Sequence, residues 1–305
     1  MTMTLENQLQ SPYVDVRATA LLAQAYAQSI GHHAARALDR SQSPALRWLS
    51  PRGVWLSLAV SSDRALTHSE RIELETALSD GEGDRPATRI TTHENATAWD
   101  HEAARIISRT TNGGVDETAL AIAPDSDLWY RRVLEDALTV LRKAWPEGAV
   151  EFSTLIRNIV VLQNTELTAS HDQLFGTLFS GTSYITSVAQ AYELLLHECG
   201  HHSMFLRVWN DDLVSNPDTL VSHPLRNDPR PISGTLHAAY ALWRMHHGLK
   251  RWCDNPDLAA DAEAFEIMER DRARLVQTLR TLNDSAKWTP AGSALFDNMA
   301  HGVLD

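Results

Sequence analysis

The chain has 305 residues, enough for one large domain or two smaller ones with a buried core. Its 39 acidic residues outnumber 27 lysines and arginines, which argues against a nucleic-acid partner because phosphate binding needs a basic surface. Two cysteines cannot form a disulfide framework, and no apolar run approaches the roughly 20 residues of a membrane helix. We therefore expect a cytoplasmic protein that does not bind membranes.

The first half of the chain is expected to be mostly helical, because its apolar residues recur at helical spacing. We expect the last helix of this half to begin after polar residues and to end at Pro146. The predicted elements are helices over 14–38, 97–109 and 125–145, loops at 81–86 and 111–114, and an apolar run at 54–60 that fits a strand or a turn of helix.

The pattern changes in the second half, where two runs rich in β-branched and aromatic residues predict strands. Ser187 followed by Gln190 fits a capping box, which marks the start of a helix. The predicted elements are a strand within 156–162, a second strand or a hairpin within 175–185, helices over 187–209, 233–253 and 256–283, and a proline-rich loop over 210–231. We expect an α+β fold, predominantly helical with a small β-sheet. A helical region over 1–147 and a second region over 148–305 are expected, although one continuous domain fits equally well.

The segment His197-Glu198-Cys199-Gly200-His201 contains the motif His-Glu-x-x-His. Residues four apart share a face of a helix, so His197 and His201 can bind one metal ion. Glu198 lies about 100° round the helix, where it can reach a metal-bound water without being a ligand. Gly200 costs about 1 kcal/mol relative to alanine in mid-helix, which indicates that something packs closely there. The alternative is a helix that carries these histidines by chance.

A metal centre needs a third protein ligand, and we choose His237. It lies in the first turns of a predicted helix, beside small residues that let another helix approach. Its alternative role is that of a hydrogen-bonded core histidine. The other downstream candidates are His223, Asp211, Asp212, Asp218, Glu263 and Glu266.

Three arginines near these histidines are candidates for binding a carboxylate. Arg226 and Arg230 lie on the proline-rich loop that leads to His237, and Arg244 follows His237 by seven residues on the same helix face. A guanidinium suits this role because its fork binds two carboxylate oxygens at once. The alternative for each is a structural ion pair, for which the candidate partners are Asp211, Asp212 and Asp228.

The motif and the string from Pro224 to His237 together resemble the HExxH-motif domain found with ribosomally made, post-translationally modified peptides. The resemblance covers residues 150–250 well and the N-terminal third only in its helical character. Leu225, which is often aromatic in the family, and Ala238-Ala239 depart from the pattern and bear on the substrate. The positions that match the family pattern are His197, Glu198, His201, Arg226, Asp228, Arg230, Gly234 and His237.

The resemblance implies a non-haem Fe(II), 2-oxoglutarate-dependent oxygenase that hydroxylates the β-carbon of a residue in a precursor peptide. It implies a fold with the motif on a central helix rather than a jelly roll. The implied iron ligands are His197, His201 and His237, and this all-histidine set suits an anionic cosubstrate because it leaves the metal more positive. One of Arg226, Arg230 and Arg244 would bind 2-oxoglutarate, and Glu198 would orient a substrate amide or a metal-bound water.

Two other functions fit the residues. In a zinc peptidase, Glu198 would act as the general base for attack by water, and Glu263 or Glu266 would be available as the third ligand. In a non-catalytic binding or carrier protein, the helices would be kept as a scaffold only.

Overall fold

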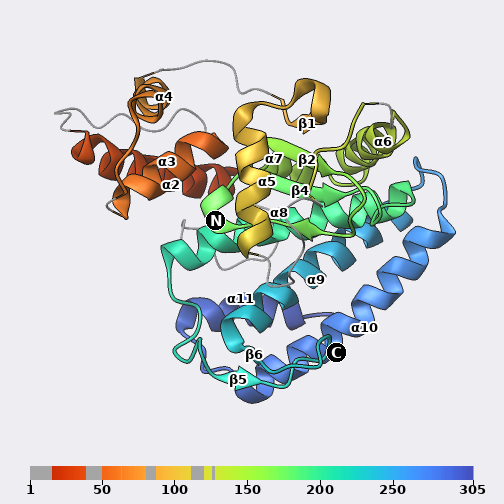
Figure 1. The fold of residues 1–305 in the computed structure, drawn as a ribbon. Helices are drawn as coiled ribbons and strands as arrows, with labels where there is room; N and C mark the ends of the chain where they lie inside the picture. Colours follow the sequence, from red (N-terminus) through yellow and green to blue (C-terminus); the bar gives the residue numbers. More distant parts are fainter. Residues whose placement is uncertain are drawn as a thin grey trace. The chain divides into compact units, whose positions relative to one another are not determined.

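The computed structural model describes residues 16–38, 50–62, 64–79, 87–110, 120–125 and 128–304. It is predominantly helical, at 65%, with a small mixed four-stranded sheet and a two-stranded hairpin (Figure 1). The predicted α+β fold class is therefore confirmed. Among the described residues, no helix is long and apolar enough to cross a membrane. The loops predicted at 81–86 and 111–114 lie outside the described residues.

Contacts divide the chain into two compact units, each made of several segments. The helical unit, as we call it, comprises the described residues of 1–19, 133–151 and 187–305, and the sheet unit comprises those of 20–132 and 152–186. Both units contain residues from either side of position 147. The division falls within three helices, which are α2 (Val16–Ala37), α6 (Leu128–Ala144) and α7 (Pro146–Leu155).

The sheet unit contains four strands in the order β1-β2-β4-β3. Parallel pairing joins β1 (Arg89–Thr91) to β2 (Asn158–Leu162) and β2 to β4 (Thr177–Gly181), whereas β3 (Thr168–Ala169) is antiparallel to β4. Every residue of β2 and β4 is buried, as is typical of parallel strands that are covered on both faces. The strands predicted within 156–162 and 175–185 are confirmed.

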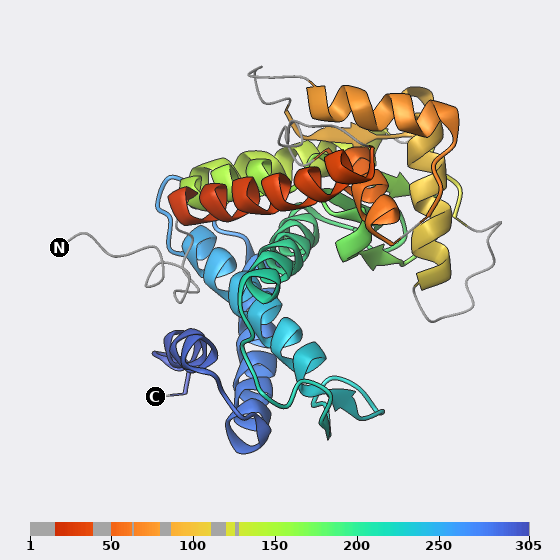
Figure 2. The same cartoon turned by 90° about the vertical axis from the view of Figure 1, so that its left-hand side faces the viewer.

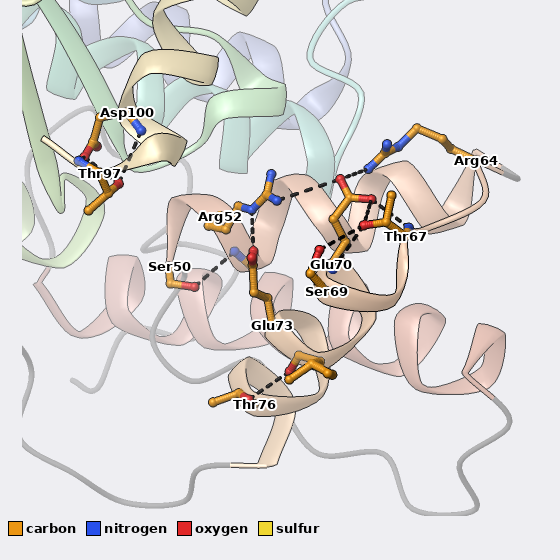
Figure 3. A network of polar contacts seen from close by, with 12 residues as sticks. Ser50, Arg52, Arg64, Thr67, Ser69, Glu70, Glu73, Thr76, Thr97 and Asp100 are labelled. Carbon is orange, nitrogen blue, oxygen red and sulfur yellow. Dashed lines mark hydrogen bonds and ion pairs between the residues drawn. The ribbon is translucent and has the colours of Figure 1, made fainter.

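The apolar run at 54–60, which by sequence fits a strand or a turn of helix, is helical and lies in α3 (Pro51–Ser61) of the sheet unit. Ser50 caps this helix by accepting a hydrogen bond from the Gly53 amide at 3.2 Å, and Pro51 suits its first turn. Figure 3 shows Arg52 and Arg64 of this region paired with the carboxylates of the next helix. The other helices here are α4 (His68–Ser79), η1 (His93–Asn95), α5 (Ala98–Thr110) and η3 (Asp172–Leu174).

The helical unit is built on three long helices, α8 (Val188–Asn210), α9 (Ile232–Cys253) and α10 (Ala262–Ser285), which pack against one another (Figures 1 and 2). Ser187 caps α8 by accepting a hydrogen bond from the Gln190 amide at 3.2 Å, as the capping signal predicts. The shorter α11 (Pro290–Ala300) comes next, capped by Thr289.

The predicted loop over 210–231 contains a small hairpin that the sequence did not indicate, since two-residue strands carry no periodicity. It pairs β5 (Leu220–Val221) with β6 (Arg230–Pro231). The Ile232 amide donates to the Thr219 carbonyl at 3.0 Å, which ties this hairpin to the start of α9. The arginine-bearing loop is thus fixed to the helix that carries His237.

Candidate metal centre

The His-Glu-x-x-His segment lies in the middle of α8, where α9 approaches closely. A Cβ atom added at Gly200 would lie 3.3 Å from the Cα of Ala241 and 3.4 Å from the Cγ of Arg244. A Cβ at Gly248 of α9 would lie only 2.5 Å from a methyl carbon of Leu196. Glycine therefore allows this approach on both helices, and the expectation that something packs closely against Gly200 is confirmed.

His197 and His201 project from one face of α8, as their spacing predicts. Their Nε2 atoms are 3.0 Å apart. Burial by the surrounding protein lowers the pKa of His197 to about 4, although 36% of its side chain is exposed to solvent. Burial, and then the neighbouring His197 and His237, hold the pKa of His201 well below its ordinary value. Both rings are therefore neutral at pH 7, which is the form of imidazole that binds metal.

His237, the predicted third ligand, lies against this pair. Its ring is 6.1 Å from the ring of His201, with 24° between the planes, and 5.5 Å from the ring of Phe205. The three histidines are thus brought together, with His237 stacked beside His201. Across the part of the chain that the structure describes, no three histidine, cysteine, aspartate or glutamate side chains are grouped closely enough to hold a metal ion. The ligand role of His237 therefore stays a prediction.

Glu198 is buried next to the histidine pair. Its side chain is 2% exposed, and its Oε1 lies 4.0 Å from Nε2 of His197. That separation is too long for a hydrogen bond between the two groups. Glu198 is therefore close to the proposed ligands without being held by His197, as expected for a group that acts on a water or a substrate atom.

His202, which follows the motif on α8, is not exposed to solvent. It is fully buried, and its Nδ1 lies 3.0 Å from the Glu198 carbonyl oxygen, to which it donates. Burial lowers its pKa to about 4, so it is a neutral core residue one helical turn behind Glu198. Cys199 is buried at 1% exposure, as expected of a small apolar residue.

The three candidate arginines lie in two different environments. Arg244 is 1% exposed, donates to the carboxylate of Glu151, and lies 4.5 Å from the ring centre of Trp145. Burial is the largest single influence and would lower the pKa of Arg244, but Glu151, Tyr240 and Cys199 together outweigh it and raise the pKa. Arg226 and Arg230 are exposed on the β5–β6 hairpin. Arg244 is therefore part of the core, whereas the other two face solvent.

Of the two hairpin arginines, one forms an ion pair with a nearby carboxylate and the other does not. Arg230 pairs with Asp228 at 3.0 Å, which is one of the ion pairs weighed from the sequence. Arg226 makes no ion pair with any described residue. Burial, followed by the charges of Arg226 and Arg230, lowers the pKa of His223, so these three side chains lie near one another. The hairpin thus presents two cations beside a neutral histidine.

Glu151 of α7 is an important residue that the sequence reasoning missed. Besides pairing with Arg244, it accepts hydrogen bonds from Ser203 at 3.1 Å and from Thr19 at 3.3 Å. Ser203 lies on α8, on the side away from the histidine pair, and its hydroxyl is 3.1 Å from that of Tyr240 on α9. The only signal in the sequence is one acid within an apolar stretch, and this does not identify its partner 93 residues away.

Glu263 and Glu266 are the glutamates that the sequence offers as the third ligand of a zinc peptidase. Glu263 accepts a hydrogen bond from the Gln190 side chain at 3.0 Å, and Gln190 precedes His197 by about two turns of α8. Glu266 is exposed on α10. Of these downstream candidates, His237 is the one whose ring lies against the histidine pair.

Comparisons with known proteins return no match to this chain, either among protein-family models or among curated proteins. The resemblance to the HExxH-motif family therefore rests on the residues of the motif and of the proline- and arginine-rich string alone.

Proposed function

We propose that this chain is a non-haem Fe(II), 2-oxoglutarate-dependent oxygenase that hydroxylates a side-chain β-carbon in a ribosomally made precursor peptide. The separation of 3.0 Å between the Nε2 atoms of His197 and His201 is the observation that carries the proposal. With a metal–nitrogen distance of about 2.1 Å, adjacent nitrogens lie about 3.0 Å apart in an octahedron and about 3.4 Å apart in a tetrahedron. The observed separation, which is also a hydrogen-bond distance between the two rings, is close to both values, so the pair fits two positions on one metal ion, iron or zinc.

The chemistry of the donor set also fits iron. Neutral imidazoles bind iron as well as zinc, and the lowered pKa values keep both rings neutral. We assign His237 as the third ligand because its ring is stacked on that of His201. Three protein ligands leave three positions on the ion for a chelating 2-oxo acid and dioxygen. When bound, iron(II) would supply the redox chemistry for hydroxylation, with dioxygen as the oxidant and 2-oxoglutarate as the co-substrate that is oxidised to succinate and carbon dioxide.

The other residues would bind and orient the reactants. Arg244 is buried in its pair with Glu151, so we assign the remote carboxylate of 2-oxoglutarate to Arg226 or Arg230, whose guanidinium groups are exposed; the Asp228 partner of Arg230 is exposed as well. Glu198, 4.0 Å from His197, would orient a substrate amide or a water. The free thiols Cys199 and Cys253 support the cytoplasmic location that forms part of the proposal.

The test is anaerobic titration of the full chain with iron(II) and 2-oxoglutarate, monitored by visible spectroscopy. We expect a metal-to-ligand charge-transfer band that needs both components and is lost in His197→Ala. Arg226→Gln or Arg230→Gln should raise the 2-oxoglutarate concentration needed to saturate the band. His68→Ala, which removes an exposed histidine of α4, should leave the titration unchanged. Absence of the band, together with no succinate formed in the presence of candidate peptides, would overturn the proposal.

Zinc peptidase activity is the second candidate, favoured by a buried Glu198 beside His197. It is weakened by the positions of Glu263, which binds Gln190, and Glu266, which is exposed. Peptide cleavage that depends on zinc and is abolished by Glu198→Gln would establish this function and refute the oxygenase.

A further inference from the structure

A pocket of about 540 Å³ lies on the helical unit, away from the candidate metal centre. Its walls come from the second half of α9, from α10 and from the turn after α11. His246, in its lining, is nine residues beyond His237, which is about 13 Å along α9 and on the opposite face of the helix. The pocket is large enough for a small metabolite, since ligand sites occupy about 300–1,000 Å³.

The lining of this pocket is positively charged, although the chain as a whole has a net charge of −12. Lys250, Arg251 and Arg272 contribute three cations, against the carboxylates of Asp254 and Glu269. Asp254 is already paired with Lys250 at 2.5 Å. Two arginines and one glutamate remain, so the unpaired charge in the pocket favours an anion.

Arg251 is held in place without being neutralised. Its Nε donates to Nε2 of His247 at 2.9 Å, and its guanidinium lies 5.4 Å from the ring centre of Trp145. His247 is itself fixed by stacking on Trp243, with ring centres 4.8 Å apart. Burial and then Arg251 lower the pKa of His247 to about 3, so it stays neutral and accepts this hydrogen bond. Among the described residues, the two terminal nitrogens of Arg251 have no hydrogen-bond or ion-pair partner.

Arg272 supplies a second guanidinium from α10. It is exposed and makes no ion pair within the described part of the chain. Its charge and those of Glu269 and Lys250 act on His246, which places these groups near one another. A fixed arginine and an unpaired arginine in one pocket form a site in which a carboxylate or phosphate can accept several charge-assisted hydrogen bonds.

We propose that this pocket binds a small ligand bearing a carboxylate or a phosphate group. Arg251 and Arg272 bind the oxyanion, while Met268 and Val303 contact the apolar part of the ligand. This site is separate from the candidate metal centre, so it does not depend on the proposed oxygenase activity.

Isothermal titration calorimetry of the full chain with phenyl phosphate and with benzoate tests the proposal. We expect saturable binding of at least one probe, and the probe that binds identifies the oxyanion. Arg251→Gln and Arg272→Gln should each weaken that binding about tenfold, the effect of losing one charge-assisted contact. Arg272 is exposed, so its replacement tests the site even if Arg251→Gln unfolds the pocket.

Two controls establish whether the probe binds in this pocket and not elsewhere on the protein. Arg280→Gln removes another exposed arginine of α10 outside the pocket and should leave the affinity unchanged. His197→Ala should also bind the probe normally, whatever its effect at the metal centre. The proposal is overturned if neither probe binds saturably, or if binding survives both Arg251→Gln and Arg272→Gln unchanged.

Discussion

The ion pair between Glu151 and Arg244 joins α7 to the face of α9 that packs on α8. Both side chains are at most 1% exposed, so solvent does not screen their interaction. Arg244→Met keeps much of the side-chain volume and removes the cation, whereas Glu151→Leu removes the anion. Each change leaves one buried charge without its counter-charge, and the double variant leaves neither.

Removing one partner of a buried ion pair costs about 3–5 kcal/mol of unfolding free energy. We expect Arg244→Met near the lower limit, because Glu151 keeps hydrogen bonds from Ser203 and Thr19. Glu151→Leu should lie near the upper limit, because Nε and Nη1 of Arg244 have no other partner among the described residues. The double variant should cost less than either single change, since apolar replacement of a buried pair is often close to neutral.

Urea unfolding monitored by circular dichroism would give the three free energies and the coupling between the two positions. Arg105→Met serves as the control, because it breaks an exposed pair with Glu102 and should change stability by less than about 0.5 kcal/mol. Single variants that lose less than about 1 kcal/mol, or a double variant equal to the sum of the two, would refute a coupled buried pair.

Three further predictions concern the same helices. His237→Ala should reduce bound iron, measured by metal analysis, nearly as much as His197→Ala; full metal retention would place the third ligand elsewhere. Burial and then Asp271 raise the pKa of Glu193 from 4.5 to about 7, so the folded state binds this proton more tightly than the unfolded chain and stability should fall as the pH rises from about 4.5 to about 7. Glu193→Gln should flatten that dependence in urea titrations at several pH values, and an unchanged slope would contradict the assignment. Gly200→Val should destabilise the chain by about 1–3 kcal/mol in urea unfolding and weaken iron binding, because α9 must move away, and unaltered iron affinity would contradict this coupling. In the same assays Gly234→Ala, whose Cβ would have 3.9 Å of clearance, should have a small effect.

The long helices could be predicted because their apolar periodicity and their caps agree. Ser187 opens α8 as the capping signal indicates, and Pro146 lies two residues beyond the end of α6. The same proline also opens α7, which the sequence reasoning did not predict. Proline suits the first turn of a helix as well as the position after one, so it marks a boundary but does not specify the type of the next element. Pro290 at the start of α11 is a second case.

The candidate metal centre also has a part that the local sequence predicts and a part that it does not. The approach of His197 to His201 results from the helical period alone, whereas the approach of His237 depends on how α9 packs on α8. That packing is set by Gly200 and Gly248, whose positions the sequence shows but whose contacts it does not. Local spacing therefore predicts two ligands, and the third depends on a tertiary contact.

Arg244 lies on the helix face that the sequence predicts, but its role differs from the predicted binding of a ligand carboxylate. It does lie on the face of α9 that carries His237, as seven-residue spacing predicts. That face packs on α8, however, so a cation on it becomes buried and needs a fixed counter-charge, which Glu151 provides. A shared helix face tells only that two side chains point in the same direction. Whether an arginine on that face binds a ligand or an ion-pair partner depends on how completely other helices cover the face. The exposed Arg226 and Arg230 are for this reason the better candidates for a mobile carboxylate.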